Sequence, residues 1–260
     1  MTYQLYEQDC VEWMRTQSDS SVDIIVSSPP YNRGIAYNTY KDRKSNYLEW
    51  QQEVWTEACR ILKPTGHLFL NIAGNSQDPF LAYEVARSVP WRVQNNIVWA
   101  KAVEFQGHIH GRSTVNINSK YSLPHGHETV WHFTAQGKTP INIAASSVPY
   151  RPEYAEDNFK RTGRTHRPTT TCWHIPYETT GYMGKAAAEV KGDKGHPAIF
   201  PRELVRHCLR VAGAKANDRV YDPFAGTGTT LWVAEKEFGC KAIGTEIDAD
   251  YADFIRKRML

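Results

Sequence analysis

Short apolar runs alternate with amphipathic stretches along this chain. The segment Val22–Ser27 is almost continuously apolar, which predicts a strand buried on both faces. In Ser45–Leu62 the large apolar residues lie roughly on one helical face, which predicts an amphipathic helix. Pro64 and Gly66 end this helix, and the apolar segment His67–Ile72 then predicts a second strand. This order of strand, helix and strand is typical of an α/β protein.

The alternation continues to the end of the chain and predicts an α/β sheet with mostly parallel strands. Asp78 is expected to cap the next helix, with Pro79 in its first turn. The further predicted strands are Tyr3–Tyr6, Arg92–Trp99, Thr129–Thr134, Arg219–Tyr221 and Lys241–Glu246, and the further predicted helices are Asp78–Ser88, Pro201–Val211, Thr229–Phe238 and Tyr251–Met259.

Two stretches interrupt the alternation and are interpreted as insertions on the sheet. Residues 101–128 are polar and rich in histidine, whereas residues 141–196 are rich in threonine, proline, glycine and charge. Loops of this kind commonly carry the function of α/β proteins. The second stretch holds a basic run without acidic residues, which we interpret as a flexible loop that contacts phosphate groups. Its members are Lys160, Arg161, Arg164 and Arg167.

A glycine-rich loop separates a predicted strand from a predicted helix near the end of the chain. Gly226 and Gly228 let the backbone approach a ligand closely, and Glu246 follows at the spacing of an acid that binds ribose hydroxyls. Leu231 stands where a dinucleotide fingerprint has its third glycine, and no lysine follows Gly228 as in a Walker loop. The pattern therefore predicts a nucleoside ligand without a polyphosphate, and S-adenosylmethionine fits this description.

A second motif, Ser-Pro-Pro-Tyr, follows directly after the strand Val22–Ser27. Pro29 and Pro30 fix the backbone and remove two N–H donors, so carbonyl acceptors remain beside a hydroxyl and an aromatic ring. This combination suits a planar ligand with an amino group. Tyr31 can stack on its plane, while Ser28 and the Pro29 carbonyl can accept hydrogen bonds from the NH₂. The turn also lies where α/β sheets bind their ligands, outside the carboxyl ends of the strands.

Composition narrows the class of protein without identifying the partner. The chain has 260 residues, 41% of them hydrophobic, and its net charge of +3 permits nucleic-acid binding without requiring it. We expect a cytoplasmic protein, because the N-terminal segment lacks a signal-peptide pattern and the five cysteines form no CxxC pair. No apolar run reaches the length of a membrane span. The His-x-His pairs at 108–110 and 125–127 lack further ligands at suitable spacing, so no metal site is expected.

Together the motifs resemble the amino-methylating DNA methyltransferases, which move a methyl group from S-adenosylmethionine to an amino nitrogen of cytosine or adenine. Ser28–Tyr31 is similar to their catalytic motif, and Phe224–Gly228 is similar to their cofactor motif. The catalytic motif comes first, which is the permuted order of the family's beta group. His196–Pro201 resembles the segment that leads into the cofactor loop. Glu7–Cys10 resembles the segment whose acid, here Asp9, contacts the cofactor adenine.

This resemblance implies a fold, a division of the chain and a set of site residues. The fold is α/β, a doubly wound, seven-stranded, mostly parallel sheet with a small inserted recognition region. Residues 1–140 would form the catalytic half, 141–195 the target-recognition insertion and 196–260 the cofactor-binding half. The implied catalytic residues are Ser28, Pro29, Pro30 and Tyr31. Those that bind the cofactor are Asp9, Phe200, Asp222, Phe224, Gly226, Gly228 and Glu246, and those that contact DNA are Arg33, Lys160, Arg161, Arg164 and Arg167.

The implied substrate is double-stranded DNA whose target base is flipped out of the helix. Hydrogen bonds from its amino group to Ser28 and a proline carbonyl would free the nitrogen lone pair for attack. Serine before Pro-Pro-Tyr favours cytosine N4 over adenine N6. The sequence also leaves room for an RNA or protein-amide methyltransferase, an inactive DNA-binding protein or an oxidoreductase. A cognate restriction endonuclease is a further candidate partner, and the chain is expected to act as a monomer or a homodimer.

Overall fold

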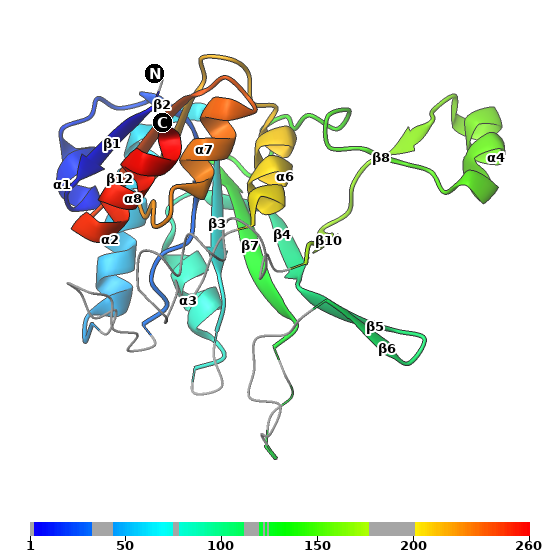
Figure 1. Ribbon diagram of the computed structural model, residues 1–260, viewed down its shortest axis with the longest axis horizontal. Helices are drawn as coiled ribbons and strands as arrows, with labels where there is room; N and C mark the ends of the chain where they lie inside the picture. The colour runs from blue at the N-terminus through cyan, green and yellow to red at the C-terminus, as the bar shows by residue number, and fades with distance from the viewer. Residues whose placement is uncertain are drawn as a thin grey trace.

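The computed structural model describes residues 3–32, 44–74, 78–111, 120–121, 123, 125–176 and 201–260. One sheet with the order β1-β12-β11-β2-β3-β7-β4-β10 dominates this part of the chain (Figure 1). All neighbouring strands are parallel, except that β7 runs antiparallel to β3 and β4. The strands are β1 (Gln4–Glu7), β2 (Val22–Ser27), β3 (Leu62–Ile72), β4 (Arg92–Ala100), β7 (His127–Thr134), β10 (Cys172–His174), β11 (Arg219–Asp222) and β12 (Lys241–Glu246).

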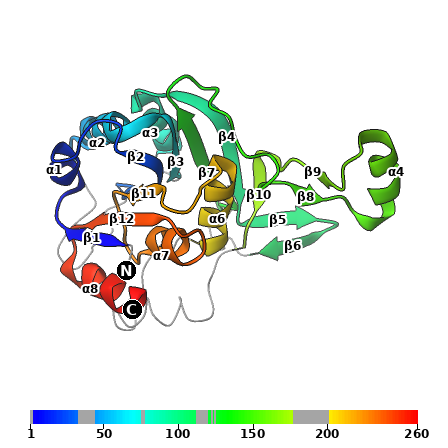
Figure 2. The same cartoon turned by 90° about the horizontal axis from the view of Figure 1, so that it is seen from above.

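Helices cover both faces of the sheet, each over its own hydrophobic core (Figures 1 and 2). Successive residues of β2 point to opposite faces, so Ile25 belongs to one core, while Ile24 and Val26 belong to the other. The predicted doubly wound α/β sheet is therefore confirmed. The helices over one face are α1 (Cys10–Arg15), α2 (Tyr47–Ile61) and α3 (Leu81–Ser88), and those over the other are α6 (Arg202–Ala212), α7 (Thr229–Lys236) and α8 (Ala249–Met259).

The described part of the sheet has eight strands, whereas seven were expected. The additional strand, β10, pairs with the outer side of β4 and has three residues, of which Trp173 is buried. A strand so short shows no alternation of polar and apolar residues. The start of α3 was also predicted wrongly, because the helix begins at Leu81 with Phe80 at the capping position instead of Asp78.

Two small structures extend from the edge of the sheet that β4 and β10 form (Figure 2). The first is a hairpin of β5 (Ala102–Phe105) and β6 (His108–Gly111). The second, which we call the arm, consists of α4 (Pro152–Thr162) and the paired strands β8 (Val148–Pro149) and β9 (His166–Arg167).

The arm corrects the prediction of a flexible loop at its basic run. Lys160 and Arg161 occupy the last turn of α4, and Gly163, with φ of +67°, ends the helix in the left-handed conformation that favours glycine. Arg167 belongs to the strand pair. The glycine and threonine residues that suggested flexibility thus lie at the end of a helix. In the ranges given above, no helix is both long and apolar enough to cross a bilayer.

Candidate active site

The two sequence motifs lie next to each other at one edge of the sheet. The glycine loop follows β11, the Ser-Pro-Pro-Tyr turn follows β2, and these two strands are parallel neighbours. Ser27, the last residue of β2, donates its hydroxyl proton to Oδ1 of Asp222, the last residue of β11, over 2.6 Å. The carboxyl ends of adjacent parallel strands form the usual ligand site of α/β proteins. The fold thus brings together segments that lie far apart in the sequence.

The glycine loop is held against the end of β12. The backbone N–H of Gly226 donates to Oε2 of Glu246 over 2.7 Å, and the N–H of Asp248 donates to Oε1 over 2.9 Å. Gly228 has φ of +74°, and a Cβ atom there would lie 2.9 Å from Cγ1 of Ile255. Glycine is therefore required at this position both by conformation and by space. The sequence spacing that singled out Glu246 thus reflects a direct hydrogen bond between Glu246 and the glycine loop.

Two carboxyl groups lie in a largely desolvated environment at this edge. Burial raises the pKa of Asp222 to about 6, against the opposing effect of hydrogen bonds from Ser27 and the backbone. Burial likewise raises the pKa of Glu246 to about 7, although it accepts two backbone hydrogen bonds. A carboxyl group that titrates near neutral pH can respond to a ligand, and such groups are enriched at functional sites.

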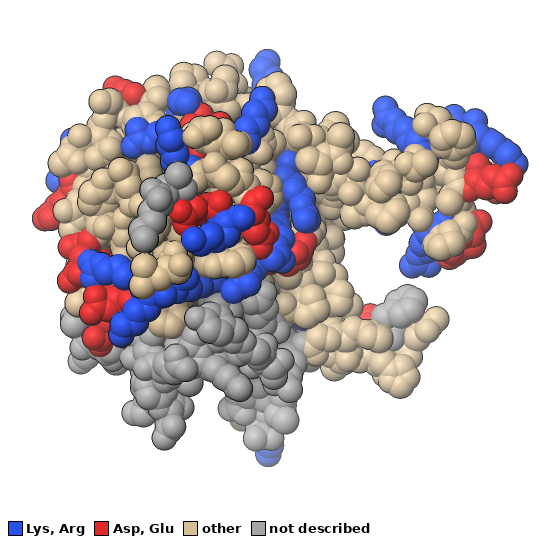
Figure 3. All heavy atoms as spheres, turned by 45° about the horizontal axis from the view of Figure 1, so that its top comes forward, with Lys and Arg blue, Asp and Glu red and all other residues tan. Residues whose placement is uncertain are grey.

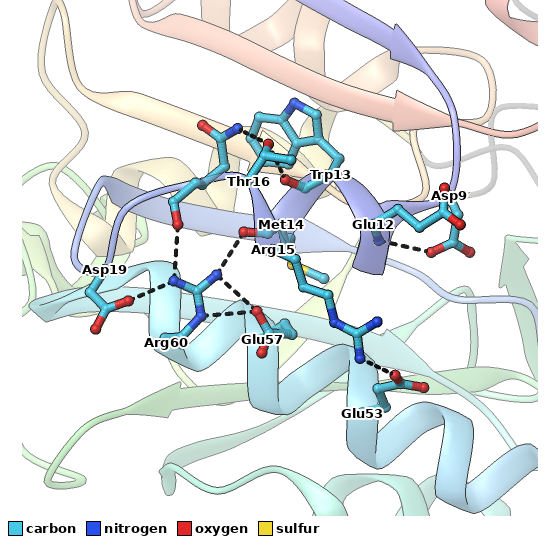
Figure 4. A network of polar contacts seen from close by, with 11 residues as sticks. Asp9, Glu12, Trp13, Met14, Arg15, Thr16, Asp19, Glu53, Glu57 and Arg60 are labelled. Carbon is cyan, nitrogen blue, oxygen red and sulfur yellow. Dashed lines mark hydrogen bonds and ion pairs between the residues drawn. The ribbon is translucent and has the colours of Figure 1, made fainter.

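Asp9 and Phe224 lie around the same loop. Asp9 follows β1, which pairs with β12. Its Oδ1 caps α1 by accepting from the N–H group of Val11 at 2.8 Å and from that of Glu12 at 3.2 Å. Figure 4 shows the contact with Glu12. The Phe224 ring packs edge-on against Trp50, with ring centroids 5.7 Å apart. The implied cofactor residue Phe200 lies outside the described residues.

The Ser-Pro-Pro-Tyr turn is held by hydrogen bonds at both ends. The hydroxyl groups of Ser28 and Tyr31 are 2.9 Å apart, and the hydroxyl of Tyr47 from α2 donates to the carbonyl of Pro30 over 2.5 Å. Tyr31 also packs against the core beneath α1, α2 and α3. The turn therefore presents Ser28 and the two prolines at a fixed position beside the glycine loop.

Three polar side chains that the sequence analysis did not single out complete this region. The Tyr31 hydroxyl lies within donating distance of Oδ1 of Asn71, at 3.1 Å, and of Oε2 of Glu128, at 3.0 Å. Oε1 of Glu128 forms an ion pair with Lys101, whose ammonium group also lies 4.7 Å from the ring centre of Trp99. A polar residue at the end of an apolar strand was the available signal for Asn71.

Four of the five predicted DNA contacts lie elsewhere, on the arm. Figure 3 shows both basic and acidic side chains on its surface. Lys160 pairs with Glu156 over 2.6 Å, and Arg167 lines a surface hollow together with Tyr154. Arg33 lies outside the described residues. In the described ranges, no three His, Cys, Asp or Glu side chains gather as metal ligands would. The remaining predicted contacts, Arg161 and Arg164, are also exposed on the arm.

Comparisons with known proteins agree with this geometry. The model of a family described as DNA methylase, of the N6 and N4 methyltransferases, matches residues 22–257. The Type II methyltransferase M.BglII from Bacillus subtilis is 27% identical over 96% of this chain and 66% of its own length. The chain thus spans slightly less than two thirds of that relative. M.HpaI from Haemophilus parainfluenzae, also a Type II methyltransferase, is 24% identical over 100% of this chain and 74% of its own length.

Solved structures show the same fold. The cytosine-N4-specific PvuII DNA methyltransferase has a TM-score of 0.74 at 21% identity, over 99% of this chain and 86% of its own. M1.HpyAVI, solved in complex with SAM, has a TM-score of 0.58 at 19% identity, over 99% of this chain and 98% of its own. Because the family model matches most of the sequence, the chain belongs to the DNA methylase family of N6 and N4 methyltransferases.

Proposed function

We propose that this protein moves a methyl group from S-adenosylmethionine to the exocyclic amino nitrogen of a base flipped out of double-stranded DNA. The observation that carries the proposal is the 2.6 Å hydrogen bond between Ser27 and Asp222, which joins the ends of β2 and β11. A nucleoside on the glycine loop and a base on the Ser-Pro-Pro-Tyr turn would therefore lie side by side. Methyl transfer needs this arrangement, because the donor and the acceptor must be aligned.

The residues around the glycine loop fit S-adenosylmethionine. Glu246 holds the N–H of Gly226, and its remaining lone pairs are available to ribose hydroxyls. Gly226 and Gly228 have positive φ angles and no side chain, so the methionine part can approach the loop backbone at these two positions. Asp9, Asp222 and Phe224 line the same edge, and Phe200 belongs to the proposed set by sequence. The bound cofactor would supply an electrophilic methyl group on its sulfonium.

The Ser-Pro-Pro-Tyr turn would prepare the amino group for attack. An amino nitrogen of a base is a poor nucleophile, because its lone pair is delocalised into the ring. Ser28 and the carbonyl of Pro29 can accept its two hydrogens, which favours a tetrahedral nitrogen with a localised lone pair. Pro30 keeps the turn rigid through its contact with Tyr47, and the Tyr31 ring would hold the flipped base.

Cytosine N4 is the proposed target. Serine precedes Pro-Pro-Tyr here, which favours cytosine within the family, and the matching PvuII enzyme is cytosine-N4-specific. Adenine N6 is the second candidate, because its amino group presents the same two donors to the turn.

The remainder of the chain would bind and select the DNA. We assign residues 1–140 to the catalytic half, 141–195 to target recognition and 196–260 to the cofactor-binding half. Exposed basic side chains of the arm would contact phosphates, and Arg33, which follows the Ser-Pro-Pro-Tyr motif in the sequence, is assigned the same role. Because the relatives are Type II methyltransferases, we propose a cytoplasmic modification enzyme with a cognate endonuclease as its partner, as a monomer or a homodimer.

Incubation of the purified protein with duplex DNA and S-adenosylmethionine labelled in its methyl group tests this function. Label should enter the DNA, and nucleoside digestion should recover it as N4-methylcytosine. Recovery as N6-methyladenine would change the target base. Label in RNA or protein alone would contradict DNA methylation. The Ser28→Ala variant should lose most of its turnover while it retains its affinity for S-adenosylmethionine.

A further inference from the structure

We infer that Glu128 is a positioning residue that orients the hydroxyl groups of Tyr31 and Ser28, so that Ser28 remains an acceptor for the amino group of the base. The inference rests on the proposed methyl transfer and adds to it a side chain that belongs to neither sequence motif. Glu128 acts through Tyr31 and does not itself contact the reacting atoms.

The direction of β7 explains how Glu128 reaches the site. This strand runs antiparallel to β3 and β4, so its first residues lie at the edge where the parallel strands end. Glu128 is opposite Trp99 near the end of β4, and Thr129 is opposite Ile72 at the end of β3. The two strands therefore place the carboxylate of Glu128 beside the turn that follows β2, at 3.0 Å from the Tyr31 hydroxyl.

Each hydroxyl group has a single proton, and this fixes which hydroxyl donates and which accepts in the hydrogen bonds around Tyr31. Tyr31 has one hydroxyl proton, and of the acceptors at Glu128 and Asn71 the charged carboxylate makes the stronger hydrogen bond. When that proton points to Glu128, the phenolic oxygen can only accept from Ser28, 2.9 Å away. The proton of Ser28 then points to Tyr31, and its lone pairs remain for a donor from the substrate.

Lys101 fixes the carboxylate in this orientation. Its ammonium group pairs with Oε1 of Glu128, which leaves Oε2 for Tyr31. The side chains of Lys101 and Glu128 are only 4% and 13% exposed, so solvent screens the pair weakly. The backbone N–H of Lys101 donates to the carbonyl of Gly126 over 2.7 Å, which ties the end of β4 to the segment before β7.

The consequence for the substrate is selection of an amino group over a carbonyl group. A Ser28 oxygen that only accepts suits the NH₂ of cytosine or adenine. It offers no proton to the O4 carbonyl of thymine, whose oxygen would face the oxygen of serine. Glu128 would thus contribute to catalysis by keeping one hydroxyl group in one direction.

A double-mutant cycle tests whether Glu128 acts through Tyr31. The protein and the variants Glu128→Gln, Tyr31→Phe and the combination of both are compared for kcat, for KM of duplex DNA and for the calorimetric Kd of S-adenosylmethionine. We expect Glu128→Gln to lower kcat about 10–100-fold with an unchanged Kd, as for loss of a hydrogen bond to a charged group. In the Tyr31→Phe protein the same change should alter kcat less than about twofold.

Two further variants separate positioning from folding. Glu57→Gln makes the same change in the Glu57–Arg60 ion pair on α2, away from the strand ends that form the site, and should leave kcat unchanged (Figure 4). Glu128→Gln leaves the buried Lys101 without its charged partner and could therefore prevent folding. In that case the double variant Glu128→Gln, Lys101→Met, in which neither side chain is charged, takes the place of Glu128→Gln in the cycle.

An equal loss of kcat in both Tyr31 backgrounds would overturn the inference, as would an unchanged kcat in Glu128→Gln or a weakened Kd that accompanies the loss. If the unaltered protein transfers no label to DNA, the proposed function itself fails, and the inference fails with it. If the unaltered protein methylates DNA but the effects of Glu128→Gln and Tyr31→Phe on kcat are additive, only the positioning role of Glu128 is wrong.

Discussion

At the residue scale, the candidate site depends on a carboxyl group that has two tasks. Glu246 fixes the glycine loop through Gly226, and in the proposed function its other lone pairs would accept hydrogen bonds from a ribose. Its raised pKa of about 7 means that burial holds the group close to the boundary between its charged and neutral forms. The charge on this side chain should therefore couple cofactor affinity to pH.

We predict that S-adenosylmethionine binds the protein more weakly as the pH falls from 8 to 6. Below a pKa of about 7 the Glu246 carboxyl is protonated, and a protonated carboxyl accepts ribose hydroxyls poorly. Glu246→Gln should weaken binding about 10–100-fold at pH 8 and should reduce this pH dependence to the part that Asp222 contributes. Isothermal titration calorimetry measures both effects. An equal Kd of the unaltered protein at pH 6 and 8 would speak against a ribose contact by Glu246.

A second prediction at this scale concerns Gly228. Gly228→Ala should lower the free energy of unfolding by about 2–3 kcal/mol, because it adds a Cβ atom 2.9 Å from Ile255 to an unfavourable φ of +74°. Gly239 is a matched control with φ of +66°, where the new Cβ would make only an ordinary contact with Ala216 at 3.5 Å. Gly239→Ala should therefore cost about 1 kcal/mol in urea unfolding. Equal losses in both variants would show that the contact with Ile255 contributes nothing.

At the element scale, the pairing of β3 with β7 encloses two histidines. His67 Nδ1 lies 2.9 Å from His132 Nε2, and the Asn95 amide lies 2.9 Å from the other ring nitrogen of His132. Burial lowers the pKa of His67 to about 4. Burial, together with the charge of His67, lowers the pKa of His132 to about 3. Both rings are therefore neutral in the folded protein near neutral pH, as parts of the sheet core.

We predict that this pair makes the fold sensitive to acid. In the unfolded chain the histidines take up protons near pH 6.5, whereas in the fold they do so only near pH 4 and below. Their contribution to stability is therefore present above pH 6.5 and is lost as the pH falls towards 4. The loss is about 3 kcal/mol for His67 alone.

The double variant His67→Gln, His132→Gln separates this contribution from that of Asp222 and Glu246, whose raised pKa values act in the opposite direction. The unaltered protein and the double variant are compared by urea denaturation. The difference between their free energies of unfolding should shrink as the pH falls from 7 to 4.5. A difference that stays constant with pH would contradict the assignment.

The sequence predicted elements well where the apolar pattern is long and poorly where it is short. The strand Val22–Ser27 and the helix over Ser45–Leu62 were recognised because each buries a continuous or periodic set of side chains. The six-residue helix α1 was missed because it is too short to show a period. The helix α4 was missed because it buries no side chain at all.

At the scale of the whole molecule, the arm places four of the predicted phosphate contacts away from the proposed catalytic edge. It extends beyond β10, at the end of the sheet opposite β1 (Figure 2). Its basic side chains could be proposed from the sequence, but their place on a helix and a strand pair could not. A protein that engages DNA with both regions would contact the duplex over an extended surface.

We predict that Arg164→Ala with Arg167→Ala weakens DNA binding and lowers its dependence on salt. Each lost phosphate contact should reduce the slope of log affinity against log salt by about one. The matched control is Arg15→Ala with Arg87→Ala, two exposed positions on α1 and α3. Fluorescence anisotropy with a labelled duplex at several salt concentrations gives the slopes. Equal slopes in the two double variants would exclude the arm from phosphate binding.

The site itself was only partly predictable at this scale. Gly226, Glu246 and Ser28 could be found because each belongs to a motif with fixed local spacing. Asn71 and Glu128 belong to the strands β3 and β7, and no local sequence pattern predicts that these strands pair. Because β7 runs antiparallel to its neighbours, its first residues, Glu128 among them, lie at the site. The family resemblance was confirmed by the family match, whereas the roles of individual residues stay predictions.

The order of strands in the sheet also bears on how the protein is made. β1 leaves the ribosome first among the described strands, yet its neighbour in the sheet is β12, whose residues are translated after all the other strands. β2 likewise pairs with β11, so the hydrogen bond from Ser27 to Asp222 cannot form until β11 has been synthesised. A nascent chain that still lacks these late strands has the Ser-Pro-Pro-Tyr turn but not the complete cofactor site that we propose. The proposed methyl transfer therefore requires that β11 and β12 have been synthesised and folded against β2 and β1.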